Sequence, residues 1–152
     1  ATIGFNELIH TALRGENITT ICVNNTNFGM TGGQASATSI LGQVTATTKN
    51  GRDPKVSGYP IKISEMIANC DGAAFVARVA IFSPQSIIKA KAAIKKAFEY
   101  QIKGLGFSFV EVIAACPTGW KLKPVQALEY IKNEVTKVHK LGIFKDLAES
   151  MA

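Results

Sequence analysis

Residues 73–82 read Ala-Ala-Phe-Val-Ala-Arg-Val-Ala-Ile-Phe, an almost continuous apolar run. A run of this kind, with no polar face, is typical of a strand that is covered on both sides. Residues 18–23 are rich in β-branched side chains, and residues 107–114 form a third apolar run. We therefore expect a sheet that contains three buried strands.

Helical patterns alternate with these strands. Apolar residues recur at helical spacing over residues 5–13 and 63–67, Ser-Pro at 83–84 signals the start of a long helix, and residues 125–138 form the last helical pattern. This alternation predicts an α/β fold with a mostly parallel, Rossmann-like sheet and helices on both faces. Residues 141–152 are expected to form a loose C-terminal tail.

Composition excludes several classes of protein. The chain has 152 residues, of which 47% are hydrophobic and 18% are charged, so it is neither disordered nor fibrous, and its apolar runs are too short to span a membrane. The net charge of +6 does not by itself indicate nucleic acid. The three cysteines, Cys22, Cys70 and Cys116, include no closely spaced pair, which favours a reducing compartment, and we expect the cytoplasm.

The segment after the first strand carries the chemistry. Residues 24–34 read Asn-Asn-Thr-Asn-Phe-Gly-Met-Thr-Gly-Gly-Gln and follow the strand directly, at the end where parallel sheets bind ligands. Amide and hydroxyl oxygens suit a magnesium ion shared with a diphosphate, and adjacent glycines let backbone N–H groups approach a phosphate. No G-x-G-x-x-G or Walker A motif supports a nicotinamide or P-loop site. The plain alternative is a Gly/Asn turn cluster without a chemical role.

The string N-N-x-x-F-G-M-T-G-G-Q closely resembles the thiamine-diphosphate loop in the beta subunit of the 2-oxoacid:ferredoxin oxidoreductases. The resemblance extends to Gly-Arg-Asp-Pro at 51–54, Ala-Arg-Val at 77–79 and Cys-Pro-Thr-Gly-Trp at 116–120. It covers the chain from the first helix to about Leu128. The family's Gly-Asp-Gly element, which carries an acidic magnesium ligand, would lie upstream of Ala1, so residues 1–140 are expected to be the C-terminal portion of a thiamine-diphosphate-binding domain.

The resemblance implies a role for each residue of the metal site. The side-chain oxygen of Asn25 and the backbone carbonyl of Asn27 would bind Mg2+. The first helix, which begins near Gly4, would point its N-terminus at the diphosphate. The activating glutamate would come from the partner alpha subunit, and no catalytic residue is expected in this chain.

The resemblance also implies a cofactor-binding set that continues through Phe28, Gly29, Met30, Thr31 and Gly32. Thr31 and Gly32 would lie against the diphosphate and thiazolium, and Phe28 and Met30 would line the pocket where the 2-oxoacid meets the cofactor. Phe28 replaces a tyrosine that is usual in relatives. Gly32 replaces a lysine that some relatives use for a substrate carboxylate, which leaves the acid specificity open.

Cys116 is a second candidate site. Alone, a cysteine before proline at a strand end is more often structural. In relatives that carry a four-iron–four-sulfur cluster in the beta subunit, a cysteine in a similar position is the fourth ligand. The other three ligands would lie upstream of Ala1, so the cluster is expected only in a complete subunit.

The function implied is oxidative decarboxylation of a 2-oxoacid to acyl-CoA, with electrons passed to ferredoxin. The substrate would be a branched-chain acid (ketoisovalerate) or 2-oxoglutarate, because Met-Thr-Gly-Gly-Gln at 30–34 differs from the pyruvate form. Partners would be the alpha, gamma and ferredoxin-like delta subunits, ferredoxin and CoA, with no nucleic acid or membrane. The alternative is a non-catalytic truncated fragment that retains only sheet and subunit-interface surfaces. In either case the isolated chain is expected to be inactive.

Other charged residues have plainer interpretations. Lys49, Arg52 and Lys55 form a basic patch that either meets a substrate carboxylate or CoA phosphates, or is simply solvated. The two histidines and the carboxylates of Glu7, Glu16 and Glu65 are expected to have no role in the site, the carboxylates lying on the surface.

Overall fold

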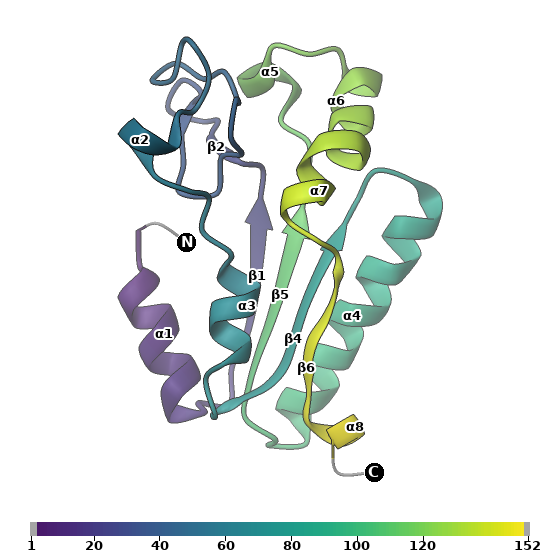
Figure 1. Ribbon diagram of the computed structural model, residues 1–152. Coiled ribbons are helices and arrows are strands. Elements are labelled where there is room, and N and C mark those ends of the chain that lie inside the picture. Colours follow the sequence, from purple (N-terminus) through teal and green to yellow (C-terminus); the bar gives the residue numbers. More distant parts are fainter. Residues whose placement is uncertain (1–2, 151–152) are drawn as a thin grey trace.

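The computed structural model describes residues 3–150. Its main sheet has four strands in the order β1 (Thr19–Asn24), β5 (Phe107–Ile113), β4 (Ala73–Ala80) and β6 (Gly142–Asp146) (Figure 1). Strands β1, β5 and β4 are parallel, and β6 runs antiparallel to β4. The predicted α/β fold with a mostly parallel sheet is therefore confirmed.

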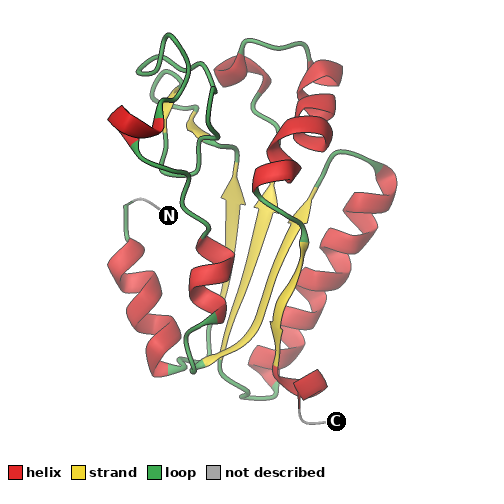
Figure 2. Ribbon diagram, in the orientation of Figure 1, coloured by secondary structure: helices red, strands yellow, loops and turns green. Residues whose placement is uncertain are grey.

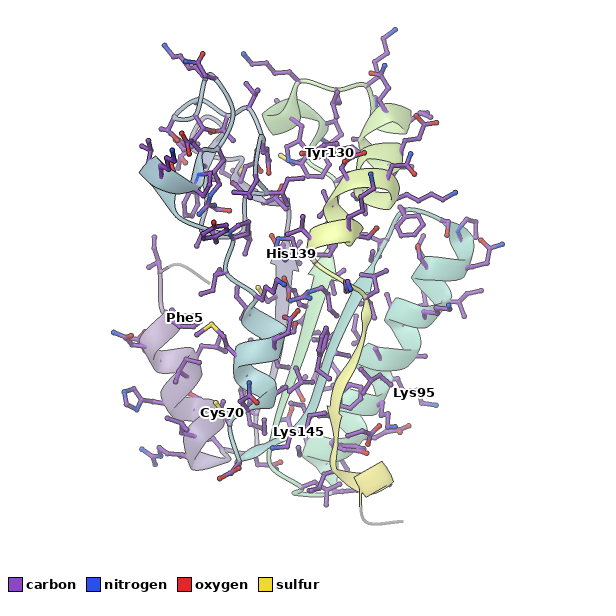
Figure 3. All side chains as sticks on the ribbon, in the orientation of Figure 1. Phe5, Cys70, Lys95, Tyr130, His139 and Lys145 are labelled. Atoms are coloured by element: carbon purple, nitrogen blue, oxygen red, sulfur yellow. The ribbon has the colours of Figure 1, made fainter. Side chains whose placement is uncertain are left out.

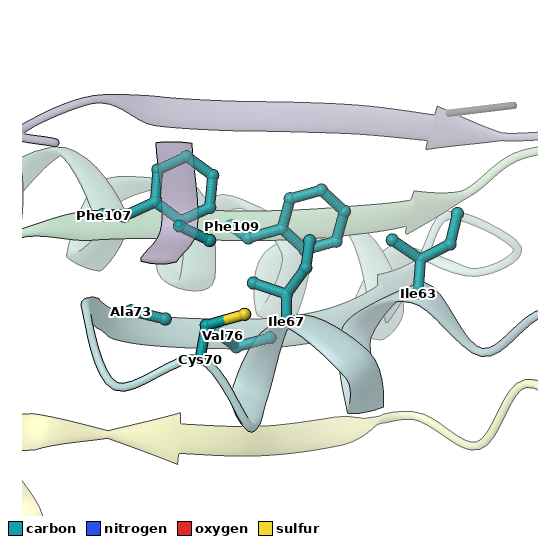
Figure 4. Packing of buried hydrophobic residues seen from close by; sticks show 8 residues of the cluster. Ile63, Ile67, Cys70, Ala73, Val76, Phe107 and Phe109 are labelled. Carbon is teal, nitrogen blue, oxygen red and sulfur yellow. The ribbon is translucent and has the colours of Figure 1, made fainter. Parts of the chain in front are cut away.

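Helices cover both faces of this sheet, as predicted (Figure 2). Helices α1 (Phe5–Arg14) and α3 (Ile63–Ala68) pack on one face, and α4 (Pro84–Ile102) packs on the other. Ser83 caps α4 by accepting a hydrogen bond from the Ser86 backbone N–H. The core beneath α1 and α3 is apolar and tightly packed (Figure 4); its buried members are Ala12, Ile63, Ile67, Cys70, Ala73, Val76, Phe107 and Phe109.

The carboxyl end of β1 opens into a long loop above the sheet. This loop contains the short antiparallel pair β2 (Asn27–Phe28) and β3 (Gln34–Ala35), and the single helical turn α2 (Pro54–Ser57). Because α1 runs antiparallel to β1, the N-terminus of α1 lies at the same end of the sheet as this loop (Figure 1).

The segment after β5 closes over the same end of the sheet. The turn α5 (Pro117–Trp120) is followed by a continuous helical segment, in which α6 (Pro124–Tyr130) leads through a π-helical turn (Ile131–Val135) into α7 (Thr136–Val138). The helix predicted over 125–138 is thus present. The π-helical turn packs Ile131 and Val135 on the carboxyl ends of β4 and β5.

Two expectations about the sheet are wrong. The segment expected to be a loose tail forms β6 and the turn α8 (Leu147–Ser150), with residues 151–152 outside the described part. Polar anchors explain the ordering, because Asp146 at the end of β6 accepts hydrogen bonds from Lys96 and Tyr100 on α4. The first strand is also not buried on both faces, because β1 lies at an edge of the sheet and the Val23 side chain is 66% exposed.

Within residues 3–150, none of the helices has the length and apolar character that crossing a bilayer requires.

Candidate functional site

Four consecutive asparagine and threonine residues, Asn24 to Asn27, form a tight turn where β1 ends. Thr26 adopts a left-handed backbone conformation with φ of 55°, which is unusual for a β-branched residue. Its backbone N–H donates to Asn24 Oδ1 at 2.9 Å, and the Asn27 N–H donates to Asn25 Oδ1 at 3.4 Å. The turn therefore directs the two candidate magnesium ligands, Asn25 and Asn27, to the end of the strand.

A cavity of about 180 Å³ lies beside this turn. It is lined by Cys22, Val23, Asn24, Asn25, Asn27, Phe28, Ser36, Thr38 and Ile63. Asn27 is buried, and within residues 3–150 neither atom of its side-chain amide has a hydrogen-bond partner. A buried amide without a partner is costly, so the arrangement suits a polar ligand that satisfies it. The lining is rich in uncharged amide and hydroxyl oxygens, which are suitable ligands for a hard cation such as Mg2+.

The structure brings together only part of the predicted cofactor-binding set. Asn25, Asn27 and Phe28 line the cavity. Met30, Thr31 and Gly32 lie outside its lining, with Met30 fully exposed to solvent and the Thr31 hydroxyl bonded to Gln34.

Cys116 lies against the candidate loop beside Gly29, although the two residues are 87 positions apart in the sequence. A Cβ placed on Gly29 or on Gly119 would come within 2.8 Å of the Cys116 sulfur, so both glycines make room for it. Trp120 Nε1 donates to the Asn25 carbonyl at 3.0 Å. The sequence identified both motifs but not this packing of one upon the other.

No group of three His, Cys, Asp or Glu side chains in the described part of the chain is placed to hold a metal ion. The role of Cys116 as a cluster ligand stays a prediction about a complete subunit.

Arg52 corrects the basic-patch interpretation. Its side chain is buried, and its guanidinium donates to backbone carbonyls of Ser36, Ser39, Ser57 and Gly58 at 2.8–3.0 Å. These bonds tie the two arms of the long loop together, so Arg52 is a structural residue and does not face a substrate or CoA. Lys49 and Lys55 are exposed.

A buried polar network that was not predicted from the sequence lies beneath the turn. Glu111 on β5 stands in register with Arg78 on β4, and Arg78 Nε donates to Glu111 Oε2 at 2.7 Å. Arg78 also donates to Glu65 on α3, which is half-buried and therefore not the surface carboxylate expected. The sign of this network in the sequence was a single charged residue within each of two apolar strands, Arg78 and Glu111.

The network shifts the pKa values of its members. Partial burial raises the pKa of Glu65, but hydrogen bonds from Arg78 and from its own backbone, together with the Arg78 charge, leave it below its ordinary value. Burial lowers the pKa of Arg78, yet the two carboxylates outweigh burial and raise it. Arg78 and Glu65 are therefore both charged at neutral pH.

His139 is buried between α7 and the long loop, where its Nε2 lies 2.8 Å from the Thr38 carbonyl (Figure 3). Burial lowers the pKa of His139 below its ordinary value, so the ring is neutral and Nε2 donates the hydrogen bond. Through this hydrogen bond His139 joins the end of α7 to the long loop.

Comparison with known proteins identifies the family. Residues 1–112 match the family described as thiamine pyrophosphate enzyme, C-terminal TPP binding domain. The chain belongs to this family. Thiamine pyrophosphate, abbreviated TPP, is another name for thiamine diphosphate. Residues 24–34, which resemble the cofactor loop of the family, are called the TPP loop below.

The relatives of this TPP-binding chain are subunits of oxidoreductases. It is 42% identical over 146 residues to ketoisovalerate oxidoreductase subunit VorA of Methanothermobacter marburgensis, covering 96% of this chain and 30% of the relative. It is 36% identical over 130 residues to 2-oxoglutarate synthase subunit KorB of Archaeoglobus fulgidus, covering 86% and 44%. The chain thus spans about a third of the length of the VorA relatives.

A solved structure shares the fold. The 2-oxoglutarate:ferredoxin oxidoreductase from Magnetococcus marinus, solved with 2-oxoglutarate, coenzyme A and succinyl-CoA bound, superposes with a TM-score of 0.69 at 18% identity. The match covers 99% of this chain and 56% of that chain, and it confirms the TPP-enzyme fold.

Gly119 offers a test of the packing beneath the TPP loop. A Cβ at this position would lie 2.1 Å from Asn27 Nδ2, so Gly119→Ala must displace the Asn27 side chain. We expect a loss of about 1–3 kcal/mol in the free energy of unfolding, measured by urea denaturation. Gly142→Ala, where the added Cβ has nothing within 4 Å, is the matched control. Equal stabilities of the two variants would contradict this packing.

His139 predicts a pH dependence of stability. Because the pKa of His139 is lowered in the folded state, the unfolded chain takes up the proton more readily. The contribution of His139 to stability is therefore fully present above its ordinary pKa of about 6.5. It is lost progressively as the pH falls below that value toward the folded pKa. We expect His139→Gln to reduce the slope of unfolding free energy between about pH 6.5 and 5. His10→Gln, at an exposed position of α1, should leave the slope unchanged. An unchanged slope in His139→Gln would be the contrary result.

Proposed function

We propose that this chain is the TPP-binding portion of the beta subunit of a 2-oxoacid:ferredoxin oxidoreductase. The reaction is oxidative decarboxylation of a 2-oxoacid to acyl-CoA, with electrons passed to ferredoxin. The observation that carries the proposal is the turn at the end of β1 in a chain of the TPP-binding family. It places Asn25 and Asn27 beside one cavity, and within residues 3–150 the buried side-chain amide of Asn27 has no hydrogen-bond partner.

The chain's own residues have definite tasks in this proposal. The Asn25 side-chain oxygen and the Asn27 backbone carbonyl bind Mg2+, which neutralises the diphosphate. The diphosphate is contacted by Thr31, by Gly32 and by the backbone N–H groups at the N-terminus of α1. Gly29 has no side chain, which lets the loop backbone lie close to Cys116. When bound, thiamine diphosphate supplies a nucleophilic carbon and an electron sink for the decarboxylation.

Ketoisovalerate is the substrate that the comparisons favour. Identity is 42% to the ketoisovalerate subunit, 36% to the 2-oxoglutarate subunit and 30% to pyruvate synthase subunit PorB of Methanothermobacter thermautotrophicus. The half-exposed Phe28 ring at the cavity suits an apolar branched chain, and Gly32 supplies no cation for a second carboxylate. Phe28 and Met30 form the substrate side of the site in this proposal.

Other subunits complete the enzyme. The relatives are named as subunits, which supports an assembly of this chain with alpha, gamma and ferredoxin-like delta chains, with CoA and ferredoxin as co-substrates. The alpha subunit supplies the activating glutamate, and Cys116 ligates a four-iron–four-sulfur cluster in the complete subunit. The described cysteines are free thiols, which suits the cytoplasm.

Calorimetry tests the proposal. The chain is titrated with thiamine diphosphate in the presence of Mg2+ and again with EDTA. We expect micromolar binding that requires Mg2+, because the ion links the asparagine oxygens to the diphosphate. The same weak or absent heat in both titrations would favour the alternative, a fragment that keeps the sheet and the subunit interface but does not hold the cofactor.

A further inference from the structure

Glu111 is a buried carboxylate that accepts hydrogen bonds from three different segments, β1, α3 and β4. Its Oε1 accepts from Asn24 Nδ2 at 2.7 Å, and its Oε2 accepts from Ser64 Oγ at 2.6 Å and from Arg78 Nε at 2.7 Å. The side chain is fully buried, so these contacts have no competition from solvent. A low local dielectric strengthens each of them.

The contact with Asn24 decides how that residue presents its amide. Asn24 Oδ1 accepts from the Thr26 N–H at 2.9 Å and from the Thr38 hydroxyl at 2.8 Å. It does so only while its NH2 group faces away from them, toward an acceptor. Glu111 is that acceptor, and it therefore sets the orientation of the Asn24 side chain.

Asn24 in turn holds the strained residue between the two proposed magnesium ligands. Thr26 has a φ of 55°, and a conformation of this kind persists only when its surroundings hold it. Asn24 holds the Thr26 N–H from one side, and Gln43 holds the hydroxyl from the other at 3.0 Å. Asn25 and Asn27 flank Thr26, so a relaxed Thr26 moves both of them.

We propose that Glu111 is a positioning residue for magnesium-dependent TPP binding, acting through Asn24 on the Asn25–Asn27 turn. The inference rests on the proposed function, because the ligands that it positions are those of the proposed site. Glu111 is not among the residues that line the cavity, and its link to the turn is the hydrogen bond from Asn24.

The test compares Glu111→Gln with the wild-type chain. The oxygen of the new amide turns toward cationic Arg78, so its NH2 meets the NH2 of Asn24 and the Asn24 side chain loses its acceptor. We expect hydrogen exchange of the Thr26 amide, followed by NMR without cofactor, to become roughly tenfold faster. We expect the affinity for thiamine diphosphate at limiting Mg2+ to fall about tenfold, with partial recovery at high Mg2+.

Glu65→Gln is the matched control. Both Glu65 oxygens accept from Arg78, on the other side of its guanidinium, so this variant perturbs the ion pair without touching Asn24. It should leave Thr26 exchange unchanged. Since Glu111 acts through Asn24, the Glu111→Gln change should add no further loss of affinity in an Asn24→Ala background.

Two results would overturn the inference: unchanged Thr26 exchange in Glu111→Gln, or additive effects of Glu111→Gln and Asn24→Ala on affinity. Failure of the proposed function is distinguishable from both. If the proposed function is wrong, the wild-type chain does not bind thiamine diphosphate in the presence of Mg2+. The exchange measurement is made without cofactor, so it still decides whether Glu111 orders the turn.

Discussion

Asn25→Ala is expected to abolish magnesium-dependent binding of thiamine diphosphate while the chain stays folded. Losing residues that merely orient a metal ligand typically weakens metal binding 10- to 100-fold, so loss of the ligand itself should weaken it by at least about 100-fold. The fold should survive, because the hydrogen bond that Asn25 Oδ1 accepts from the Asn27 N–H is long, at 3.4 Å. Calorimetry measures the affinity, and circular dichroism measures the stability.

The control for this variant is Asn50→Ala, an exposed asparagine in the same long loop. It should bind thiamine diphosphate as the wild type does. Affinity retained in Asn25→Ala would remove Asn25 from the site and leave the oxygen ligands to be sought elsewhere in the cavity.

Arg78→Met is expected to cause the largest loss of stability. Arg78 is fully buried and pairs with Glu111 at 2.7 Å and with Glu65 at 2.5 Å. Its removal leaves the Glu111 carboxylate buried without a counter-charge, a change that costs about 3–5 kcal/mol. Urea denaturation of the wild type and the variant measures the difference in the free energy of unfolding.

Arg14→Met provides the comparison. Arg14 pairs with Glu16 at 2.7 Å, but its side chain is 74% exposed, so its loss should cost less than about 1 kcal/mol. A cost for Arg78→Met no larger than for Arg14→Met would contradict a stabilising role of the buried Arg78–Glu111 pair.

Much of the fold follows from apolar pattern alone. Strands β4 and β5 are nearly continuous apolar runs because both faces of each are covered, and this pattern was sufficient to predict them. The same reasoning overestimated the burial of β1, because a run of β-branched residues does not reveal whether a strand is central or at an edge of the sheet. It also missed β6, where only five residues form the strand and the anchors, Lys96 and Tyr100, lie far away in sequence.

The candidate site divides in the same way. The position of Asn25 and Asn27 beside one cavity was predictable because both residues directly follow β1, whereas their roles as Mg2+ ligands are implied by the family resemblance and stay a prediction. The packing of Cys116 and Gly119 against the TPP loop was not predictable, because it depends on β1 and β5 being neighbours in the sheet. Arg52 was assigned to a basic patch because charge alone does not reveal that a guanidinium is buried among carbonyl groups.

In the proposed function, the turn at the end of β1 binds the metal ion of a TPP site. The most direct measurement is anomalous scattering from Mn2+, substituted for Mg2+ in crystals of the chain grown with thiamine diphosphate. We predict a peak within about 2.5 Å of both Asn25 Oδ1 and the Asn27 carbonyl oxygen. Bound cofactor with its Mn2+ peak away from both oxygens would remove Asn25 and Asn27 from the metal site.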